Sequence, residues 1–164
     1  MPLLENGRIV ADGWTDVADD APCPDKTAII VSPDRLEEAL ARAEAAPLGV
    51  RLAPEDDVAL LRTILPRLGL VCVNFPTFRD GRAFTQARAL REHLHFTGEI
   101  RATGPALPDQ YEFMLRCGIT TVEIPDGSDP AIWEKAHRRF TVAYQPSVLH
   151  EKAQGFGFRR FLDA

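Results

Sequence analysis

Five apolar segments recur along the chain at nearly even intervals, and each is followed by a segment with helical periodicity. The strand-like segments begin near residues 27, 49, 70, 98 and 120, one every 21–28 residues. Helical patterns follow over 33–45, 55–68, 84–95, 109–117 and 130–140, the second of them broken near Pro66, with a short strand at 141–144. Repeated βα units predict an α/β fold with a mainly parallel sheet and right-handed crossovers. Eight units do not fit in 164 residues, so we expect an open three-layer sheet or an incomplete TIM-like barrel.

The two ends of the chain lie outside this repeat. Residues 1–22 read as a short β-ribbon, in which "RIV" and "GWTDV" flank a turn at Asp12-Gly13. The βα repeats occupy 27–144, and no structure is assigned to the tail at 145–164. The length suits a single domain spanning 1–164 with its own hydrophobic core.

Composition excludes several classes of function. The net charge is −5, which argues against nucleic acid as the main partner. No apolar run reaches 18 residues and no signal peptide is recognised, so we expect a cytoplasmic protein that does not enter the membrane. The three cysteines and four histidines show no metal-ligand spacing, and no nucleotide or flavin fingerprint is present. We therefore expect no metal and no cofactor.

The segment "FPTFRDGRAFTQARALRE" (75–92) is unusually rich in arginine for an acidic chain. It leaves the third predicted strand at its C-terminal end, where parallel α/β folds bind ligands. Arg79 and Arg82 flank the turn at Asp80-Gly81, and Arg101 lies in the next strand on the face opposite Ile100 and Ala102. One hypothesis is an anion pocket, formed by these arginines with Thr85, Gln86 and the free N–H groups of a helix N-terminus. The alternative is a structural network in which Asp80, Glu99 and Asp109 pair with the arginines.

Four more residues are candidates for the same site. Arg91 lies at the border of the apolar face of the 84–95 helix, and Thr103 shares its strand face with Arg101. Asp109 and Gln110 open the next predicted helix, where Asp109 is either a helix cap or a polar member of the strand-end loop.

Several short motifs in this order resemble a bacterial family known as domain of unknown function 934. The resemblance covers about residues 27–124 and runs through "FRDGRAFTQARALRE", "GEIRATG" and "DQYEFMLRCG". The matching positions are Phe78, Asp80, Gly81 and Arg82, then Ala87, Arg88, Leu90 and Arg91, then Gly98, Glu99, Arg101, Ala102 and Gly104, then Asp109 and Gln110, and finally Arg116, Cys117 and Gly118. Thr85 stands where the family commonly has serine, and Ile100 where it commonly has leucine.

The resemblance implies a role near sulfite reduction, because the family is described as probable oxidoreductases encoded beside sulfate-assimilation genes. Reducing sulfite takes six electrons and a cofactor to carry them, for which this chain has no recognisable ligands. We therefore expect an accessory protein of assimilatory sulfate and sulfite reduction that binds a small anion or anionic metabolite. An oxidoreductase-type enzyme of sulfur metabolism is the alternative, so the sequence leaves open whether the chain is an enzyme.

A second alternative is a subunit without a pocket of its own, which docks on sulfite reductase components. The tail "GFGFRRFLDA" (155–164), with three phenylalanines and two arginines, is the candidate contact. The same tail is also a candidate for exchange between two copies of the chain in a homodimer.

Overall fold

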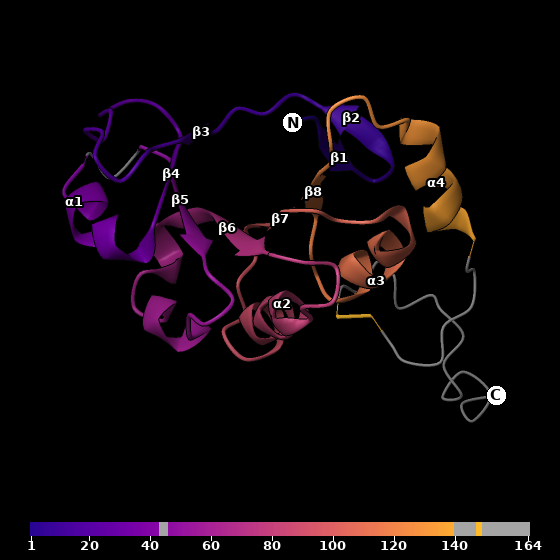
Figure 1. The fold of residues 1–164 in the computed structure, drawn as a ribbon. Helices are drawn as coiled ribbons and strands as arrows, with labels where there is room; N and C mark the ends of the chain where they lie inside the picture. Colours follow the sequence, from indigo (N-terminus) through magenta and orange to yellow (C-terminus); the bar gives the residue numbers. More distant parts are fainter. Residues whose placement is uncertain (43–45, 140–146, 149–164) are drawn as a thin grey trace.

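The chain folds around one mainly parallel, curled sheet, as the βα rhythm predicts (Figure 1). The computed structural model describes residues 1–42, 46–139 and 147–148. Its strands are β1 (Leu3–Glu5), β2 (Arg8–Val10), β3 (Thr15–Asp16), β4 (Ile29–Val31), β5 (Leu48–Leu52), β6 (Leu68–Asn74), β7 (Glu99–Thr103) and β8 (Thr121–Glu123). The predicted strand at 141–144 and the tail from 149 onward lie outside the described residues.

The helices are shorter than the sequence pattern indicates. Those described are α1 (Leu36–Leu40), α2 (Arg82–Glu92), α3 (Tyr111–Arg116) and α4 (Pro130–Arg138), with 3-10 turns η1 (Pro33–Arg35), η2 (Val58–Leu61), η3 (Leu65–Arg67) and η4 (Pro108–Gln110). Over 55–68, where a helix broken near Pro66 is expected, the structure has only the two 3-10 turns η2 and η3, so the α-helix expected there is wrong and the break near Pro66 is confirmed. Pro66 lacks an N–H for a helical hydrogen bond and clashes with the preceding turn, so a continuous helix is disfavoured there.

Strand order fixes which face of the sheet carries the helices. The order is β2-β1-β8-β7-β6-β5-β4-β3, and the pairs from β3 to β8 are all parallel. Because each unit adds its strand on the same side with a right-handed crossover, successive helices cover one face. The main core lies there, where residues of β5 to β8 such as Val50, Val71, Ile100 and Val122 pack on α1, α2 and α3. On the other face, Trp14 packs on Ile30, Leu70 and Cys72, so in the described part of the chain the helices form one layer rather than the two of a three-layer fold.

The N-terminal hairpin forms at a different turn from the one expected. Leu3 to Glu5 pair antiparallel with Arg8 to Val10 through a turn at Asn6 and Gly7, whose φ angles are 48° and 79°. Asn-Gly with two positive φ angles is the preferred two-residue hairpin turn. β1 also pairs antiparallel with β8, so the ribbon joins the main sheet. The hairpin predicted around Asp12-Gly13 is therefore wrong.

Residues 11–14 instead form a strap that runs from β2, at one edge of the sheet, to β3 at the other (Figure 1). The strap crosses the face that the helices leave uncovered. Trp14 packs there with a second buried cluster made of Ile30, Leu70 and Cys72. Gly69 permits this approach, because a Cβ at that position would lie 3.2 Å from the indole ring. The strap thus roofs part of the open face and leaves a polar space beside Trp14.

Candidate functional site

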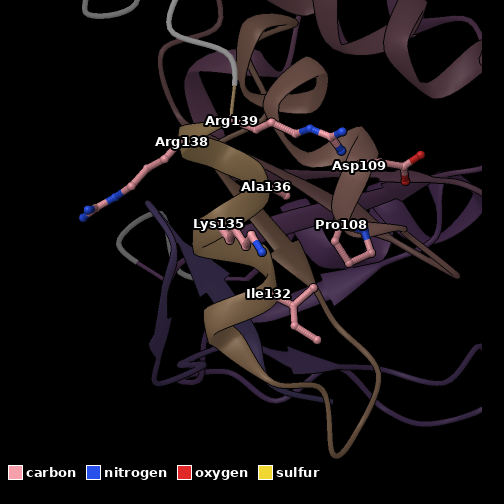
Figure 2. A pocket seen from close by; sticks show the side chains of 7 residues that line it. All are labelled: Pro108, Asp109, Ile132, Lys135, Ala136, Arg138 and Arg139. Carbon is pink, nitrogen blue, oxygen red and sulfur yellow. The ribbon is translucent and has the colours of Figure 1, made fainter.

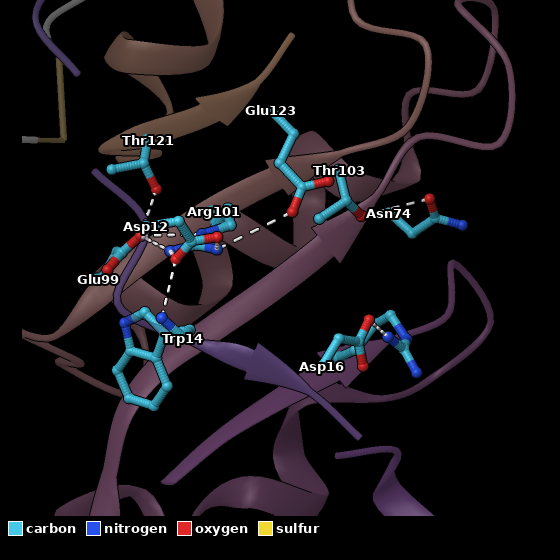
Figure 3. A network of polar contacts seen from close by, with 10 residues as sticks. Asp12, Trp14, Asp16, Asn74, Glu99, Arg101, Thr103, Thr121 and Glu123 are labelled. Atoms are coloured by element: carbon cyan, nitrogen blue, oxygen red, sulfur yellow. Dashed lines mark hydrogen bonds and ion pairs between the residues drawn. The ribbon is translucent and has the colours of Figure 1, made fainter. Parts of the chain in front are cut away.

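Arg101 is the centre of the polar network beneath the strap (Figure 3). Its side chain is only 1% exposed, although it carries a charge. Both terminal nitrogens donate to the Asp12 carboxylate, Nη1 to Oδ2 at 2.8 Å and Nη2 to Oδ1 at 3.0 Å. Nε donates to Glu99 Oε1 at 3.0 Å. Carboxylates therefore pair with Arg101 as in the structural-network alternative, with Glu99 as expected there and with Asp12 in addition.

The network is completed from β8, which supplies a hydroxyl and a third carboxylate. Thr121 Oγ1 donates to Glu99 Oε1 at 2.5 Å. Glu123 Oε1 lies 3.9 Å from Arg101 Nη1, too far for a hydrogen bond. Among the described residues nothing donates a hydrogen bond to the Glu123 carboxylate. Of the three acids around Arg101, Glu123 therefore keeps the most unused acceptor capacity.

The pKa values of Asp12 and Glu123 shift in opposite directions in this environment. Burial alone would raise the pKa of Asp12, but hydrogen bonds from Arg101 and from the Trp14 N–H outweigh it and lower the pKa. Burial raises the pKa of Glu123, and the attraction of Arg101 offsets only part of that effect. Asp12 is thus held as a carboxylate, whereas Glu123 is a partly desolvated acid whose ion-pair partner, Arg101, donates no hydrogen bond to it.

A pocket of about 270 Å³ opens between the strap and the sheet, and we call it the strap pocket. Its walls are Asp12, Trp14, Asp16, Ile30, Arg51, Cys72, Asn74, Arg101, Thr103, Gly104 and Glu123. Arg51, Cys72, Arg101 and Thr121 are neighbours in one row across β5 to β8. Asn74, Thr103 and Glu123 each lie two residues further along their strands. The polar walls are therefore at the C-terminal ends of the strands, where parallel sheets place ligand sites.

Arg51 has the most accessible guanidinium group in this pocket. Its side chain is 34% exposed, and its described ion-pair partner is Asp16 on β3, which is 56% exposed. A second pocket of about 330 Å³, the outer pocket, adjoins the first and also has Arg51 and Asn74 in its wall. The outer pocket is otherwise lined by Asp19, Ser32, Pro33, Asp34, Leu52, Ala53 and Asp56. Arg51 thus faces both spaces, unlike Arg101, whose donors are already used by carboxylates.

Cys72 lies in the pocket wall but is not prepared for nucleophilic chemistry. Burial raises the pKa of its thiol to about 12. Since the thiolate is the reactive form, almost none is present at neutral pH. Within the described parts of the chain, moreover, no group of three or more His, Cys, Asp or Glu side chains is arranged to hold a metal ion.

The arginine-rich loop, in contrast, forms a separate surface at the start of α2. Arg82 is bound to Asp80, with Nη2 2.6 Å from Oδ2. Asp80 also accepts a hydrogen bond from the Arg82 backbone N–H, so a carboxylate already occupies the helix N-terminus expected to hold an anion. The Arg79 guanidinium lies over the Phe78 ring, 5.3 Å from its centre, and Thr85 is exposed on α2. The loop and Arg101 therefore do not share one pocket.

Gln86 and Arg91 hold backbone segments in place. Gln86 Nε2 donates to the carbonyls of Ala53 and Asp56, at 2.8 and 3.0 Å, and so anchors the loop that lines the outer pocket. Arg91 donates to three carbonyl oxygens, those of Gly118, Phe96 and Gly98. Burial lowers the pKa of Arg91 to about 10, with no carboxylate contributing to the shift. Its place at the border of the packed helix face is thus explained by main-chain contacts.

The last two predicted site residues lie beside η4. Gln110 Oε1 accepts a hydrogen bond from Leu107 N at 3.3 Å, and Gln110 Nε2 donates to Phe78 O at 2.9 Å. Gln110, rather than Asp109, therefore supplies the cap at this turn. Asp109 is one of the residues that line a different pocket of about 740 Å³, together with Pro108 of η4 and with Ile132 and Lys135 of α4 (Figure 2). Asp109 does not belong to the Arg101 network. The aspartate that pairs with Arg101 is Asp12.

Among the predicted site residues, the structure brings together Arg101 and Thr103 in the strap pocket. The pocket residues that sequence reasoning missed include Asp12, Asp16, Arg51, Asn74 and Glu123. Strand alternation carries a signal for two of them. Arg51 follows Val50, and Glu123 follows Val122, so each faces away from the core as Arg101 does. Asp12 carries no such signal, since its role depends on the path of the strap.

No helix in the described part of the chain is long and apolar enough to cross a membrane. No curated protein and no solved structure matches this chain. A family model described as "Bacterial protein of unknown function (DUF934)" matches residues 49–154, about two thirds of the sequence. That range includes β5 to β8 and therefore Arg51, Asn74, Arg101, Thr103 and Glu123, but not the strap. The chain belongs to this family of bacterial proteins, as the order of its short motifs indicates.

Proposed function

We propose that this chain is an accessory protein of assimilatory sulfate and sulfite reduction that binds a small anionic metabolite in the strap pocket. The observation that carries the proposal is the half-exposed Arg51 guanidinium, which faces both strand-end pockets. The link to sulfur assimilation comes from the description of the family that the motifs resemble. The ligand site therefore shifts from the arginine loop at 79–82, the expected position, to the ends of β5 and β6.

Arg51 suits an incoming anion because its present partner is easily replaced. Asp16 is more than half exposed, and exposed ion pairs contribute little to stability. Guanidinium groups bind carboxylate, sulfate and phosphate through paired hydrogen bonds. Asn74 and Thr103 line the same pocket, where Thr103 Oγ1 lies 3.4 Å from Asn74 Oδ1, and they supply further polar contacts.

The arrangement of strands and helices supports the same position for the ligand site. The strand order from β3 to β8 follows the sequence, and the helices lie on one face, as in a TIM-like barrel that stops before closure. In such barrels the ligand lies at the C-terminal ends of the strands. The strap takes the place of the missing strands and covers part of the face that a complete barrel would enclose.

Thermal unfolding in the presence of candidate anions tests the proposal. We expect sulfite, sulfate, phosphate or adenosine phosphosulfate to raise the melting temperature of the wild-type protein. A ligand at 100 times its dissociation constant adds about 2.7 kcal/mol of stability. Arg51→Gln should abolish the shift, whereas Arg82→Gln, which removes the same charge from the loop, should preserve it. A shift lost in Arg82→Gln and kept in Arg51→Gln would return the site to the loop.

An enzyme of sulfur metabolism is the alternative for the same pocket. The Cys72 thiol, with its pKa near 12, argues against a cysteine nucleophile there. An enzyme would instead have to use the carboxylates around Arg101, of which Glu123 is the one with a raised pKa. Turnover of a pathway metabolite that disappears in Glu123→Gln would favour this alternative.

A docking role is favoured by one other feature, an exposed apolar patch formed by Phe78, Leu107 and Phe113. Their exposed fractions are 53%, 40% and 46%. Gln110 bonds to the backbone of Phe78 and of Leu107, while the Phe113 ring packs on Phe84, 4.7 Å between ring centres. Aromatic and arginine side chains are typical of interface centres, and Arg79 stacks on Phe78.

Capture of sulfite reductase components by the immobilised protein tests the docking role. The double variant Phe78→Ser/Phe113→Ser should lose capture, and Leu60→Ser, an exposed apolar residue on η2, is the matched control. Deletion of 153–164 tests the tail, which lies outside the described residues. Light scattering on the same deletion separates docking from tail exchange in a homodimer. Capture that survives both changes would remove the docking role.

A further inference from the structure

The balance of charge in the strap pocket narrows the class of ligand that fits it. The walls carry three carboxylates, on Asp12, Asp16 and Glu123, against the two guanidinium groups of Arg51 and Arg101. Arg101 is already saturated by Asp12 and Glu99. An anion that displaces Asp16 from Arg51 adds one more negative charge to a pocket that is already acidic. A ligand that carries an ammonium group beside its acid group is therefore better matched to these walls than a simple anion.

Glu123 is the pocket residue that a second ligand group would meet. Its side chain is 23% exposed, and its described ion-pair contact, with Arg101, is 3.9 Å long. Within the described residues its oxygens accept no hydrogen bond. A half-buried carboxylate without close donors is incompletely solvated, and an ammonium group supplies both a charge and three N–H donors. The raised pKa of Glu123 agrees with this lack of a close partner.

We infer that the ligand is a small zwitterion of the amino-acid class, whose acid group binds Arg51 and whose ammonium group binds Glu123. This inference rests on the proposed binding function and specifies its substrate class. Arg51 lies on β5 and Glu123 on β8, on either side of β6 and β7. Both line the same space of about 270 Å³, which is the size of a small amino acid with a few waters.

The neighbouring side chains supply the remaining contacts of such a ligand. Asn74 and Thr103 lie on the two strands between Arg51 and Glu123 and offer amide and hydroxyl groups. Trp14 on the strap and Ile30 on β4 form an apolar wall, suited to a short aliphatic or thiol-bearing side chain. The pocket thus separates acid, ammonium and side-chain positions, as amino-acid recognition requires.

Isothermal titration with three matched compounds tests the inference in the presence of a phosphine reductant. L-Cysteine carries both charges, 3-mercaptopropionate lacks the amine, and cysteamine lacks the carboxylate. We expect L-cysteine to bind at least tenfold more tightly than either analogue. L-Serine, titrated in parallel, shows whether the thiol contributes.

Two variants and one control test which pocket residue binds the ammonium group of the ligand and which binds its acid group. Glu123→Gln should bring L-cysteine to the affinity of 3-mercaptopropionate, with an unchanged or higher melting temperature. Arg51→Gln should weaken L-cysteine and 3-mercaptopropionate together. Glu92→Gln removes an exposed carboxylate paired with Arg88 on α2 and should change neither.

Three outcomes overturn the inference, and the first two can be told apart from failure of the proposed function. If 3-mercaptopropionate binds as tightly as L-cysteine, the ammonium site is wrong, although anion binding at Arg51 still stands. If L-cysteine and L-serine fail to bind at 10 mM while sulfite or phosphate stabilises the wild-type protein, the ligand is a simple anion. If Arg51→Gln changes nothing in either experiment, both the inference and the proposed function are wrong.

Discussion

Replacing Arg101 by glutamine is the sharpest test of the network beneath the strap. The change removes a cation that is 1% exposed and leaves Asp12, Glu99 and Glu123 with no cation in their midst. Breaking a buried ion pair by removing one partner costs about 3–5 kcal/mol. The lower end applies here, because the three carboxylates remain 36%, 24% and 23% exposed and water still screens them. We expect a loss of about 3 kcal/mol in the free energy of unfolding.

Urea denaturation measures this loss directly. With a slope of roughly 2 kcal/mol per molar for a domain of this size, the midpoint should fall by about 1.5 M. Arg82→Gln is the control, since it removes an exposed arginine and should leave the midpoint unchanged. Equal midpoints for wild type and Arg101→Gln at pH 7 would refute the argument.

The stability lost in Arg101→Gln should also depend on pH, in a direction that follows from the pKa shifts. In the wild type, Arg101 lowers the pKa of Asp12, so this stabilisation is present above the unfolded pKa of about 3.9 and is lost as pH falls through the lower folded pKa. In Arg101→Gln the Trp14 N–H still donates to Asp12, but the lowering effect of Arg101 on the pKa values of Asp12 and Glu123 is gone, so burial raises both relative to the wild type. Protonation of these carboxyl groups then removes the uncompensated negative charge in the variant. The difference in the free energy of unfolding between wild type and Arg101→Gln should therefore shrink between pH 7 and pH 4. A deficit that grows on acidification would contradict the assigned cause.

Three further outcomes follow from the described contacts. Gly104→Ala should cost more than about 1 kcal/mol, measured by urea denaturation, because φ is 96° and a Cβ would press on the Phe75 carbonyl; an unchanged midpoint would mean that this turn adapts. Arg91→Lys should lower the free energy of unfolding by about 2 kcal/mol and speed amide exchange near α2, because one ammonium group cannot reproduce the hydrogen bonds to three carbonyls. Unchanged stability would show that the positive charge alone suffices. Ellman's reagent at pH 8 should label Cys23 before Cys72, because burial and a pKa near 12 protect the Cys72 thiol until the protein unfolds. Early labelling of Cys72 would mean that the strap does not cover it.

The parallel strands were predictable from sequence because each one is a short apolar run between polar loops. Their expected starts at 49, 98 and 120 lie within one residue of β5, β7 and β8. The burial of the Arg101 guanidinium was also predictable, since Ile100 and Ala102 had to face the core and Arg101 the opposite side.

The strap was not predictable by the same reasoning. Two turn signals stand close together, Asn6-Gly7 and Asp12-Gly13, and only pairing with β8 decides which one closes the hairpin. In the structure the Asp12 carboxylate accepts a hydrogen bond from Trp14 N, so this turn bends the strap rather than closing a hairpin. The partner of Arg101 lies 89 residues away in sequence, and local periodicity carries no information on such a contact.

The failed helix over 55–68 has a local cause. Its apolar spacing resembles a helix, yet Asp57 caps one 3-10 turn through Ala59 N, and Pro66 lies in the first positions of the next turn, where its missing N–H cannot continue a helix from the preceding residues. Gln86 then fixes the loop before these turns through the carbonyls of Ala53 and Asp56. That long-range anchoring from α2 favours a compact loop at the mouth of the outer pocket.

The most direct test of the central claim is an NMR titration that follows the side-chain Nε–Hε signals of the arginines. Binding of an anionic or zwitterionic ligand in the strap pocket should shift the Arg51 signal, together with the side-chain amide of Asn74 and the backbone amide of Thr103. The signals of Arg79 and Arg82 should stay in place. Shifts confined to Arg79 and Arg82, with Arg51 unmoved at saturating ligand, would contradict the account and place the site on the arginine loop.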